Sequence, residues 1–546
     1  MKHFKILSLA AIILAVLPVF TACGGKEEKK LPTSTILSCT IDGRKAAKGK
    51  GVSGVPTENI EVRLEFTGEI DAARFDGDKI WFSNLGAFDV SQIDKYTLGL
   101  TLAGPLKEYT AYSLIILGGD QLGVHLVGDY SFSFTTGLED KIVFPEMPSE
   151  DLLTLVQQRT FAYFWDYAHP VSGLARERLG SGETVTTGGS GFGLMAIPVG
   201  IERGFITREE GCERAIKIVG FLKDKAQKFH GAFPHWLNGT SGQAISFSTK
   251  DNGADLVETA FLMEGLLTLR NFFDGRNIDE TNLRKDITAL WEDVEWDWFT
   301  RGGQSVLYWH WSPDFDWQMN MQIRGWNEAL IVYVLAASSP THSISNAVYD
   351  NGWAANVKNG KKYYDITLPL GEDFGGPMFF AHYSFLGLDP RKLSDEYANY
   401  WTQNVAHARI NHAYCAANPK GYYGYSNRCW GLTASDYPGG YIASSPTKDT
   451  GTIAPTAALA SFPYTPDESM DALEYFYYHL GNRIWGEYGF YDAFNLEERW
   501  FATSYIAIDQ GPIICMIENY RTGLLWNSFM TDPDVRRGLN LLGFKY

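Results

Sequence analysis

The chain has 546 residues and a formal net charge of −17, from 64 acidic and 47 basic side chains. This length exceeds what one hydrophobic core organises, so two or three units are expected. The negative charge excludes nucleic acid and an anionic membrane surface as partners, because both require a basic patch.

The N-terminus has the pattern of an export segment. Residues 1–5 are basic, residues 6–20 are apolar, and Thr21-Ala22-Cys23 follows. The apolar run is too short for a stable membrane span. This order resembles a bacterial lipoprotein signal, which implies that residues 1–22 are removed and that Cys23 carries the lipid. Residues 23–33 are then a tether, and a secretory signal cleaved nearby is the alternative.

The same resemblance implies a place in the cell. A lipid-anchored protein of this type is expected at the outer membrane of a Gram-negative bacterium, on its periplasmic or its outer face. Membrane contact is expected only through the anchor. The five other cysteines are scattered and form no CxxC pair, so neither a disulfide framework nor a zinc site is predicted.

Residues 34–137 alternate apolar and polar side chains in short runs separated by Gly and Asp turns. This pattern predicts a small antiparallel all-β sandwich. The segment at residues 130–136, Tyr-Ser-Phe-Ser-Phe-Thr-Thr, resembles the last strand of bacterial Ig-like domains. Residues 138–148, with two prolines, are predicted to be a linker.

Residues 149–546 have a sequence pattern typical of helices. Six Gly-rich loops, at about residues 190, 252, 325, 375, 451 and 509, each open a strongly apolar segment. Amphipathic segments alternate with them at 151–167, 207–229, 280–298, 394–410, 467–480 and 532–541. The alternation predicts an inner and an outer ring of helices, an all-α (α/α)6 toroid. Because inner helices run parallel, their N-termini and the preceding loops meet at one end.

The second of these loops carries three acids. Asp251 occupies a position typical of a helix N-cap, and Asp255 and Glu258 follow four and seven residues later, on the same helix face. This spacing predicts an acidic pocket at the mouth of an enclosed helix. The alternative is a cap followed by two acids that favour the helix dipole.

Further acids are predicted at the same end, at Glu328, Asp492 and Asp509. Glycoside hydrolysis needs one protonated carboxyl and one ionised carboxylate, and crowded acids separate their pKa values to give both. No HExxH, P-loop or GxSxG motif is present, and the 11 histidines show no metal-ligand spacing. The prediction is therefore a glycosidase without a metal or other cofactor.

Several segments together resemble a known family. They are Phe-Ala-Tyr-Phe-Trp-Asp from 161, Thr-Gly-Gly-Ser-Gly-Phe-Gly from 187, Asp-Asn-Gly-Ala-Asp-Leu-Val-Glu from 251, Arg-Gly-Trp-Asn-Glu from 324, Gly-Phe-Tyr-Asp-Ala-Phe-Asn from 489 and Ile-Asp-Gln-Gly-Pro-Ile from 508. Over residues 149–546 the chain resembles the glycoamylase-like domain of glycoside hydrolase family 144. The resemblance implies an (α/α)6 barrel that hydrolyses β-1,2-glucan by inversion without a metal.

The candidate site follows from these motifs. Glu328 is the predicted general acid and Asp509 the predicted base, with Asp492 and Glu258 as rivals for the base. The predicted substrate-binding residues are Asp251, Asp255, Arg324, Trp326, Tyr491, Trp236 and Trp430, although Arg324 could instead pair with a buried acid.

The expected substrate is an oligo- or polysaccharide, the expected products are sophorose or short sophoro-oligosaccharides, and the expected state is monomeric. Exo and endo action both remain open. Two other functions also remain: hydrolysis of α-glucan, as the label "glucoamylase" implies, and a non-catalytic surface lipoprotein that binds glycan.

Overall fold

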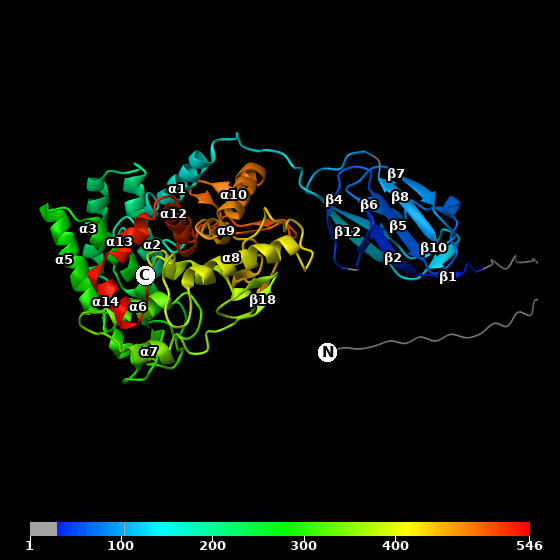
Figure 1. Cartoon of the computed structure of the whole chain (residues 1–546). Helices are drawn as coiled ribbons and strands as arrows, with labels where there is room; N and C mark the ends of the chain where they lie inside the picture. The colour runs from blue at the N-terminus through cyan, green and yellow to red at the C-terminus, as the bar shows by residue number, and fades with distance from the viewer. Residues whose placement is uncertain (1–29, 48, 103) are drawn as a thin grey trace, which may run out of the picture. The chain divides into compact units, whose positions relative to one another are not determined.

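The computed structural model describes residues 30–47, 49–102 and 104–546 (Figure 1). The chain divides into two compact units, one ending at Leu138 and the other running from Glu139 to Tyr546. The predicted signal segment and Cys23 lie outside the described residues. Within the described part of the chain, every helix is too short or too polar to cross a bilayer.

The first unit is all-β. Its two larger sheets have the strand orders β3-β2-β5-β8-β7 and β4-β12-β9-β6, and a small sheet has the order β1-β11-β10. The strands are β1 (Thr33–Ser34), β2 (Ile36–Ile41), β3 (Arg44–Ala46), β4 (Val52–Val55), β5 (Glu61–Phe66), β6 (Ile80–Ser83), β7 (Phe88–Gln92), β8 (Thr97–Leu102), β9 (Ala111–Ile116), β10 (Gly119–Gln121), β11 (Val124–Leu126) and β12 (Tyr130–Thr136).

Alternation along the strands explains why these sheets pack face to face. In β5, Val62, Leu64 and Phe66 are buried and the side chains between them are exposed. They share one core with Phe82 and Phe134 of the other large sheet. The unit is thus a β-sandwich, as the alternation predicted, but it is not wholly antiparallel, because β1 pairs with β11 and β4 with β12 in parallel. The resemblance to Ig-like domains stays a prediction.

The second unit is mainly helical. Its helices are α1 (Ser149–Trp165), α2 (Thr187–Glu202), α3 (Arg208–Asp224), α4 (Leu256–Phe272), α5 (Ile278–Asp293), α6 (Leu330–Ser338), α7 (Asn346–Asn351), α8 (Tyr400–Ala417), α9 (Pro455–Leu459), α10 (Pro466–Glu474), α11 (Gly481–Ile484), α12 (Ala507–Arg521), α13 (Leu524–Met530) and α14 (Pro533–Leu541). Short antiparallel strand pairs lie between them, including β13 (Thr184–Thr186) with β14 (Trp236–Asn238), and the hairpin of β20 (Ala434–Tyr437) with β21 (Gly440–Ala443).

The apolar segments contact one another in sequence around the unit. Helix α2 packs between α12 and α4, α4 contacts α6, and α6 contacts the short turn Tyr383–Phe385. His382 Nε2 lies 3.0 Å from Ser461 Oγ, just after α9, and α9 contacts α12. These neighbours form a closed circuit, with amphipathic helices such as α1 and α3 packed outside it.

Two inner segments depart from the prediction. The segment that follows Gly375 is not a helix but two 3-10 turns, Met378–Ala381 and Tyr383–Phe385, and α9 has only five residues. Side chains from distant parts of the sequence donate hydrogen bonds to carbonyl oxygens that would accept from backbone N–H groups in a longer helix. Tyr464 donates to Ala381 O at 3.0 Å, and Trp526 Nε1 donates to Phe385 O at 2.8 Å. Tertiary hydrogen bonds therefore replace the helical ladder here.

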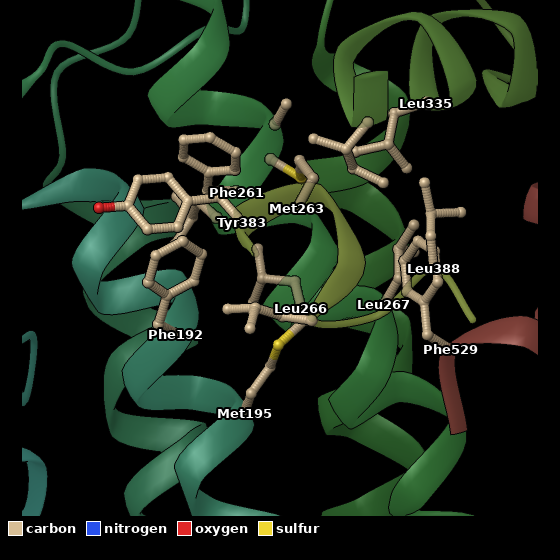
Figure 2. Close-up of a cluster of buried hydrophobic side chains, with 14 of the residues drawn as sticks. Phe192, Met195, Phe261, Met263, Leu266, Leu267, Leu335, Tyr383, Leu388 and Phe529 are labelled. Atoms are coloured by element: carbon tan, nitrogen blue, oxygen red, sulfur yellow. The ribbon is translucent and has the colours of Figure 1, made fainter. Parts of the chain in front are cut away.

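Helices α2 and α4 lie unusually close together. A Cβ placed on Gly191 would lie 2.1 Å from Phe261 O, and one on Gly265 would lie 2.2 Å from Gly191 O. Only glycine permits this backbone approach. Figure 2 shows the apolar layer around the contact, in which Phe192 of α2 meets Phe261 of α4 and Tyr383. This contact holds α2 against α4 one to two turns below the start of each helix.

Candidate active site

A cavity of about 480 Å³ lies at the N-terminal ends of α2, α4 and α6. Its wall combines acidic and aromatic side chains with one arginine and one histidine. These residues are Glu177, Arg178, His235, Trp236, Phe247, Glu258, Phe261, Trp309, Glu328, Phe379, Tyr383 and Tyr441. Apolar ring faces beside hydrogen-bonding groups suit a sugar, whose rings have apolar C–H faces and hydroxyl edges.

The start of α4 differs from the prediction. Asp255, not Asp251, is the N-cap, since its Oδ1 accepts from the N–H groups of Val257 and Glu258 at 3.0 Å each. Residues 254–255 pair as a strand with residues 310–311, which prevents the helix from starting earlier. Asp251 instead lies in a turn before this strand and is buried.

His235 brings positive charge to this acidic group. Its Nδ1 lies 2.9 Å from Asp255 Oδ2, and its Nε2 lies 3.9 Å from Glu258 Oε1. Burial lowers the pKa of His235, but Glu258, Asp255 and Asp251 outweigh burial and raise it to about 9. His235 is therefore an imidazolium at neutral pH.

The two aspartates respond in opposite ways. Burial alone would raise the pKa of Asp255, but the hydrogen bond from His235 and the nearby His310 lower it below its usual value. Burial, and then the negative charge of Asp255, raise the pKa of Asp251 to about 7. One aspartate thus stays ionised while the other holds a proton near neutral pH.

A cation could also be held at this position. His235, Asp251 and Asp255 each offer one ligand atom, and these atoms lie within 4.8 Å of one another. A nitrogen and two carboxylates suit a divalent transition metal. The protonated His235 already supplies positive charge to the same carboxylates, so the local charge balance does not require a metal.

Glu258 lies in the first turn of α4 and faces the cavity. Its Oε2 accepts from the N–H of Gly188 at 2.7 Å, at the start of α2. A Cβ on Gly188 would lie 2.6 Å from that oxygen, so this contact requires glycine. Burial and the negative charge of Asp255 raise the pKa of Glu258, against the lowering effects of His235 and Gly188.

Glu328 lies two residues before α6 and lines the same cavity. Burial raises the pKa of its carboxyl to about 7, and the charges of Asp255 and Glu258 add to the effect. A carboxyl of this kind still holds its proton near neutral pH and can donate it, as a general acid must.

Asp492 and Asp509 form a buried pair behind the cavity wall. Asp492 Oδ2 accepts from the N–H of Asp436 at 2.6 Å, while Asp492 Oδ1 and both oxygens of Asp509 have no partner outside the pair among the described residues. Burial, and then the charge of Asp436, raise the pKa of Asp492 to about 7, although the Asp436 N–H and a hydrogen bond with Asp509 lower it. Burial, and then the charge of Asp492, raise the pKa of Asp509. The pair therefore shares one proton and one negative charge.

Comparisons with known proteins show the family of this chain. Residues 320–533 match the Glycoamylase family model. This chain shares 50% sequence identity with an endo-β-1,2-glucanase from Chitinophaga pinensis, whose structure is known in complex with sophorotriose and glucose. The match covers 73% of this chain and 99% of that one, with a TM-score of 0.72. The chain belongs to the glycoamylase-like family, glycoside hydrolase family 144.

Two further members of family 144 extend the comparison. An exo β-1,2-glucooligosaccharide sophorohydrolase (non-reducing end) of Parabacteroides distasonis is 50% identical over 417 residues, which are 72% of this chain and 58% of that protein. The chain thus spans less than two thirds of that relative. A β-1,2-glucanase structure from P. distasonis is 41% identical, covers 94% of this chain and 74% of its own, and has a TM-score of 0.72.

Not every residue predicted from the family's motifs lies in the cavity. Trp236 lines it, in contact with Phe247 at a ring-centre distance of 4.9 Å. Trp326 is buried in the core against Phe385, and Trp430 is fully buried. These two tryptophans pack the fold instead of facing the substrate cavity.

Arg324 and Tyr491 also lie outside the cavity wall. Arg324 is exposed, and it donates to Gln322 Oε1 at 2.7 Å and to the carbonyl of Asn351. It pairs with no buried acid among the described residues. Tyr491 packs on Tyr505 at a ring-centre distance of 4.9 Å. Proximity in sequence to Glu328 and Asp492 was the reason for both predictions, and the side chains turn away.

Four polar residues of the site were missed by the sequence analysis: Glu177, Arg178, His235 and Asp436. Arg178 and Asp436 are 258 positions apart and meet only in the folded chain. His235 adjoins the predicted Trp236, and this adjacency was the one signal that could have revealed it. The other three belong to no motif of paired acids.

Proposed function

We propose that the protein is a glycoside hydrolase that cleaves β-1,2-linked glucan with inversion and releases sophorose or short sophoro-oligosaccharides. The observation that carries the proposal is Glu328, a cavity carboxyl that holds its proton to about pH 7 beside the ionised Asp255. The linkage comes from the relatives, which are named for β-1,2-glucan or its oligosaccharides.

In the proposed reaction Glu328 donates its proton to the glycosidic oxygen as the bond from that oxygen to the anomeric carbon breaks. Water attacks the anomeric carbon from the opposite face, and its proton passes to the Asp492–Asp509 pair. The pair suits this role because, among the described residues, three of its four carboxyl oxygens have no partner outside the pair. Glu258 is already bound to Gly188 N–H and is better suited to hold a sugar hydroxyl.

The proposal includes the fold of the helical unit. We infer an (α/α)6 toroid from the closed circuit of six inner segments and the amphipathic helices outside it. Parallel inner segments explain why Gly188, Glu258, Glu328 and Asp509, far apart in sequence, all lie near one end.

The test incubates the protein with β-1,2-glucan and with starch in parallel and follows product sizes over time. The proposal expects hydrolysis of β-1,2-glucan alone, with the α-anomer formed first in an NMR time course. Sophorose as the only early product would establish exo action, and a ladder of oligosaccharides would establish endo action. Hydrolysis of starch alone would support the α-glucan alternative, and binding without hydrolysis would support the non-catalytic one.

The anchor is a separate proposal, supported by the Thr21-Ala22-Cys23 pattern. We infer lipidation at Cys23 and attachment to the outer membrane. Labelling cells with a fatty-acid analogue tests this, because Cys23→Ser should abolish the label and release the protein from the membrane fraction. Light scattering of the released protein tests the expected monomer.

A further inference from the structure

The hairpin formed by β20 and β21 is part of the cavity wall, since Ala434, Tyr441 and Ala443 line the cavity. Asp436 lies directly opposite Tyr441 across the hairpin. Tyr441 is 48% exposed, so its ring is available to a ligand. Whatever fixes Asp436 therefore also fixes an aromatic ring of the cavity.

The Asp436 carboxylate is held from two other segments of the chain. Arg178 Nη1 donates to both of its oxygens at 3.1 and 3.2 Å, and the Ser504 hydroxyl donates to Oδ2 at 2.6 Å. Arg178 Nε also donates to both oxygens of Glu177, at 3.0 and 3.1 Å. Charge-assisted bonds that contact both oxygens are strong and fix orientation.

The backbone of the same residue contacts the catalytic pair. The N–H of Asp436 donates to Asp492 Oδ2 at 2.6 Å, and the N–H of Asp492 donates to Ser504 O at 3.0 Å. The segment of Arg178 is tied to the start of α12 as well, because Ala507 N–H donates to Glu177 O at 3.0 Å. Asp509 lies in that first turn of α12.

We propose that Arg178, Asp436 and Ser504 are positioning residues that clamp hairpin β20–β21 onto the Asp492–Asp509 pair. One ionic cluster then holds both the aromatic wall of the cavity and the base of the reaction. The proposal rests on the proposed function, because the pair is the base only if the protein hydrolyses glycan.

The clamp also sets the charge around the pair. The positive charge of Arg178 favours the ionised pair, whereas the negative charge of Asp436 opposes it. The base works in its ionised form, so activity is lost as the pH falls through the pKa of the pair. Among the described residues, the other titratable groups that face the cluster include Glu177, His235, Tyr383 and Tyr441.

The experiment compares three variants on β-1,2-glucan. In Asp436→Asn the acid limb of kcat should move to lower pH, and in Arg178→Gln it should move to higher pH, by roughly half a pH unit or more in each case. Because both variants loosen the geometry, kcat should also fall about 10- to 100-fold. Arg178→Lys keeps the charge but not the four bonds, so kcat should fall with the acid limb unmoved.

A matched control removes a comparable ion pair elsewhere. Asp389 accepts from Arg391 through both carboxylate oxygens, and neither residue lines the cavity. Asp389→Asn should leave kcat and the acid limb unchanged. Circular dichroism and thermal unfolding verify that each variant is folded.

An infrared titration of the protonated carboxyl band, assigned by its loss in Asp509→Asn, follows the pair without any substrate. If the midpoint pH of this band shifts in opposite directions in Asp436→Asn and Arg178→Gln, the clamp is supported. This holds even if the wild-type protein hydrolyses no glucan, a result that would overturn only the proposed function. Equal shifts, no shifts, or unchanged kcat in both variants of an active enzyme would overturn the clamp.

Discussion

Replacing Glu328 by glutamine should have opposite effects on rate and on stability. The amide keeps the size of the side chain but has no proton to donate to the leaving oxygen. Removal of a general acid typically costs about 10²–10⁴-fold in rate. We expect a loss in this range for kcat on β-1,2-glucan, with KM changed little, because the amide retains hydrogen-bonding capacity.

The pH dependence of activity tests the same prediction independently. The pKa of Glu328 is raised from 4.5 to about 7, and the acid works in its protonated form. Wild-type activity should therefore fall as the pH rises above about 7, and this alkaline limb should be absent from the residual activity of Glu328→Gln. A sophoroside with an aryl leaving group, which needs little protonation, should lose less than about 10-fold.

Stability should respond in the other direction. A raised pKa in the folded state means that the Glu328 carboxyl contributes stability below pH 4.5, and this stability is lost as the pH rises through about 7. Glutamine cannot ionise, so Glu328→Gln should have a higher unfolding temperature than the wild type at pH 8 and not at pH 4. Scanning calorimetry at the two values measures this.

Two results would refute the reasoning. Near wild-type kcat on β-1,2-glucan would show that Glu328 is not the acid. An alkaline limb that persists in Glu328→Gln would show that another group donates the proton.

Three more predictions follow from packing. Gly191→Ala would bring Cβ to 2.1 Å from Phe261 O, and denaturant unfolding should show the helical unit destabilised by several kcal/mol. The control, Gly220→Ala, has open space around it and should be neutral or stabilise the unit by up to about 1 kcal/mol. Trp236→Ala should raise KM roughly 3- to 10-fold by removing a cavity ring, and an unchanged KM would contradict its placement. Trp430→Phe should lower the unfolding temperature and leave KM unaffected, since this side chain is fully buried.

The sequence predicted the type and order of the elements well where periodicity is strong. The amphipathic segment predicted at 151–167 is α1, and the one at 207–229 contains α3. The predicted helix after Gly375 failed because hydrogen bonds from Tyr464 and Trp526 capture its carbonyls, and both residues lie far along the chain. Local patterns do not contain such competitors.

The site shows the same division. Glu258 and Glu328 were predicted from acids at helix mouths, and both line the cavity. Trp326 was predicted from its nearness to Glu328, but the backbone directs its ring into the core. Arg178 and Asp436 are joined only by tertiary structure, so a single sequence offers no pattern that pairs them.

Under the proposed function, the glycine contact between α2 and α4 limits how the substrate preference of this protein could change. Gly191 and Gly265 leave no space for any larger side chain, so the wall that presents Gly188 and Glu258 cannot be widened or narrowed by stepwise substitution. New chain-length preferences must therefore arise in the loops around the mouth, where insertions are tolerated. The family's core would stay constant while its exo-acting and endo-acting members diverge at the rim.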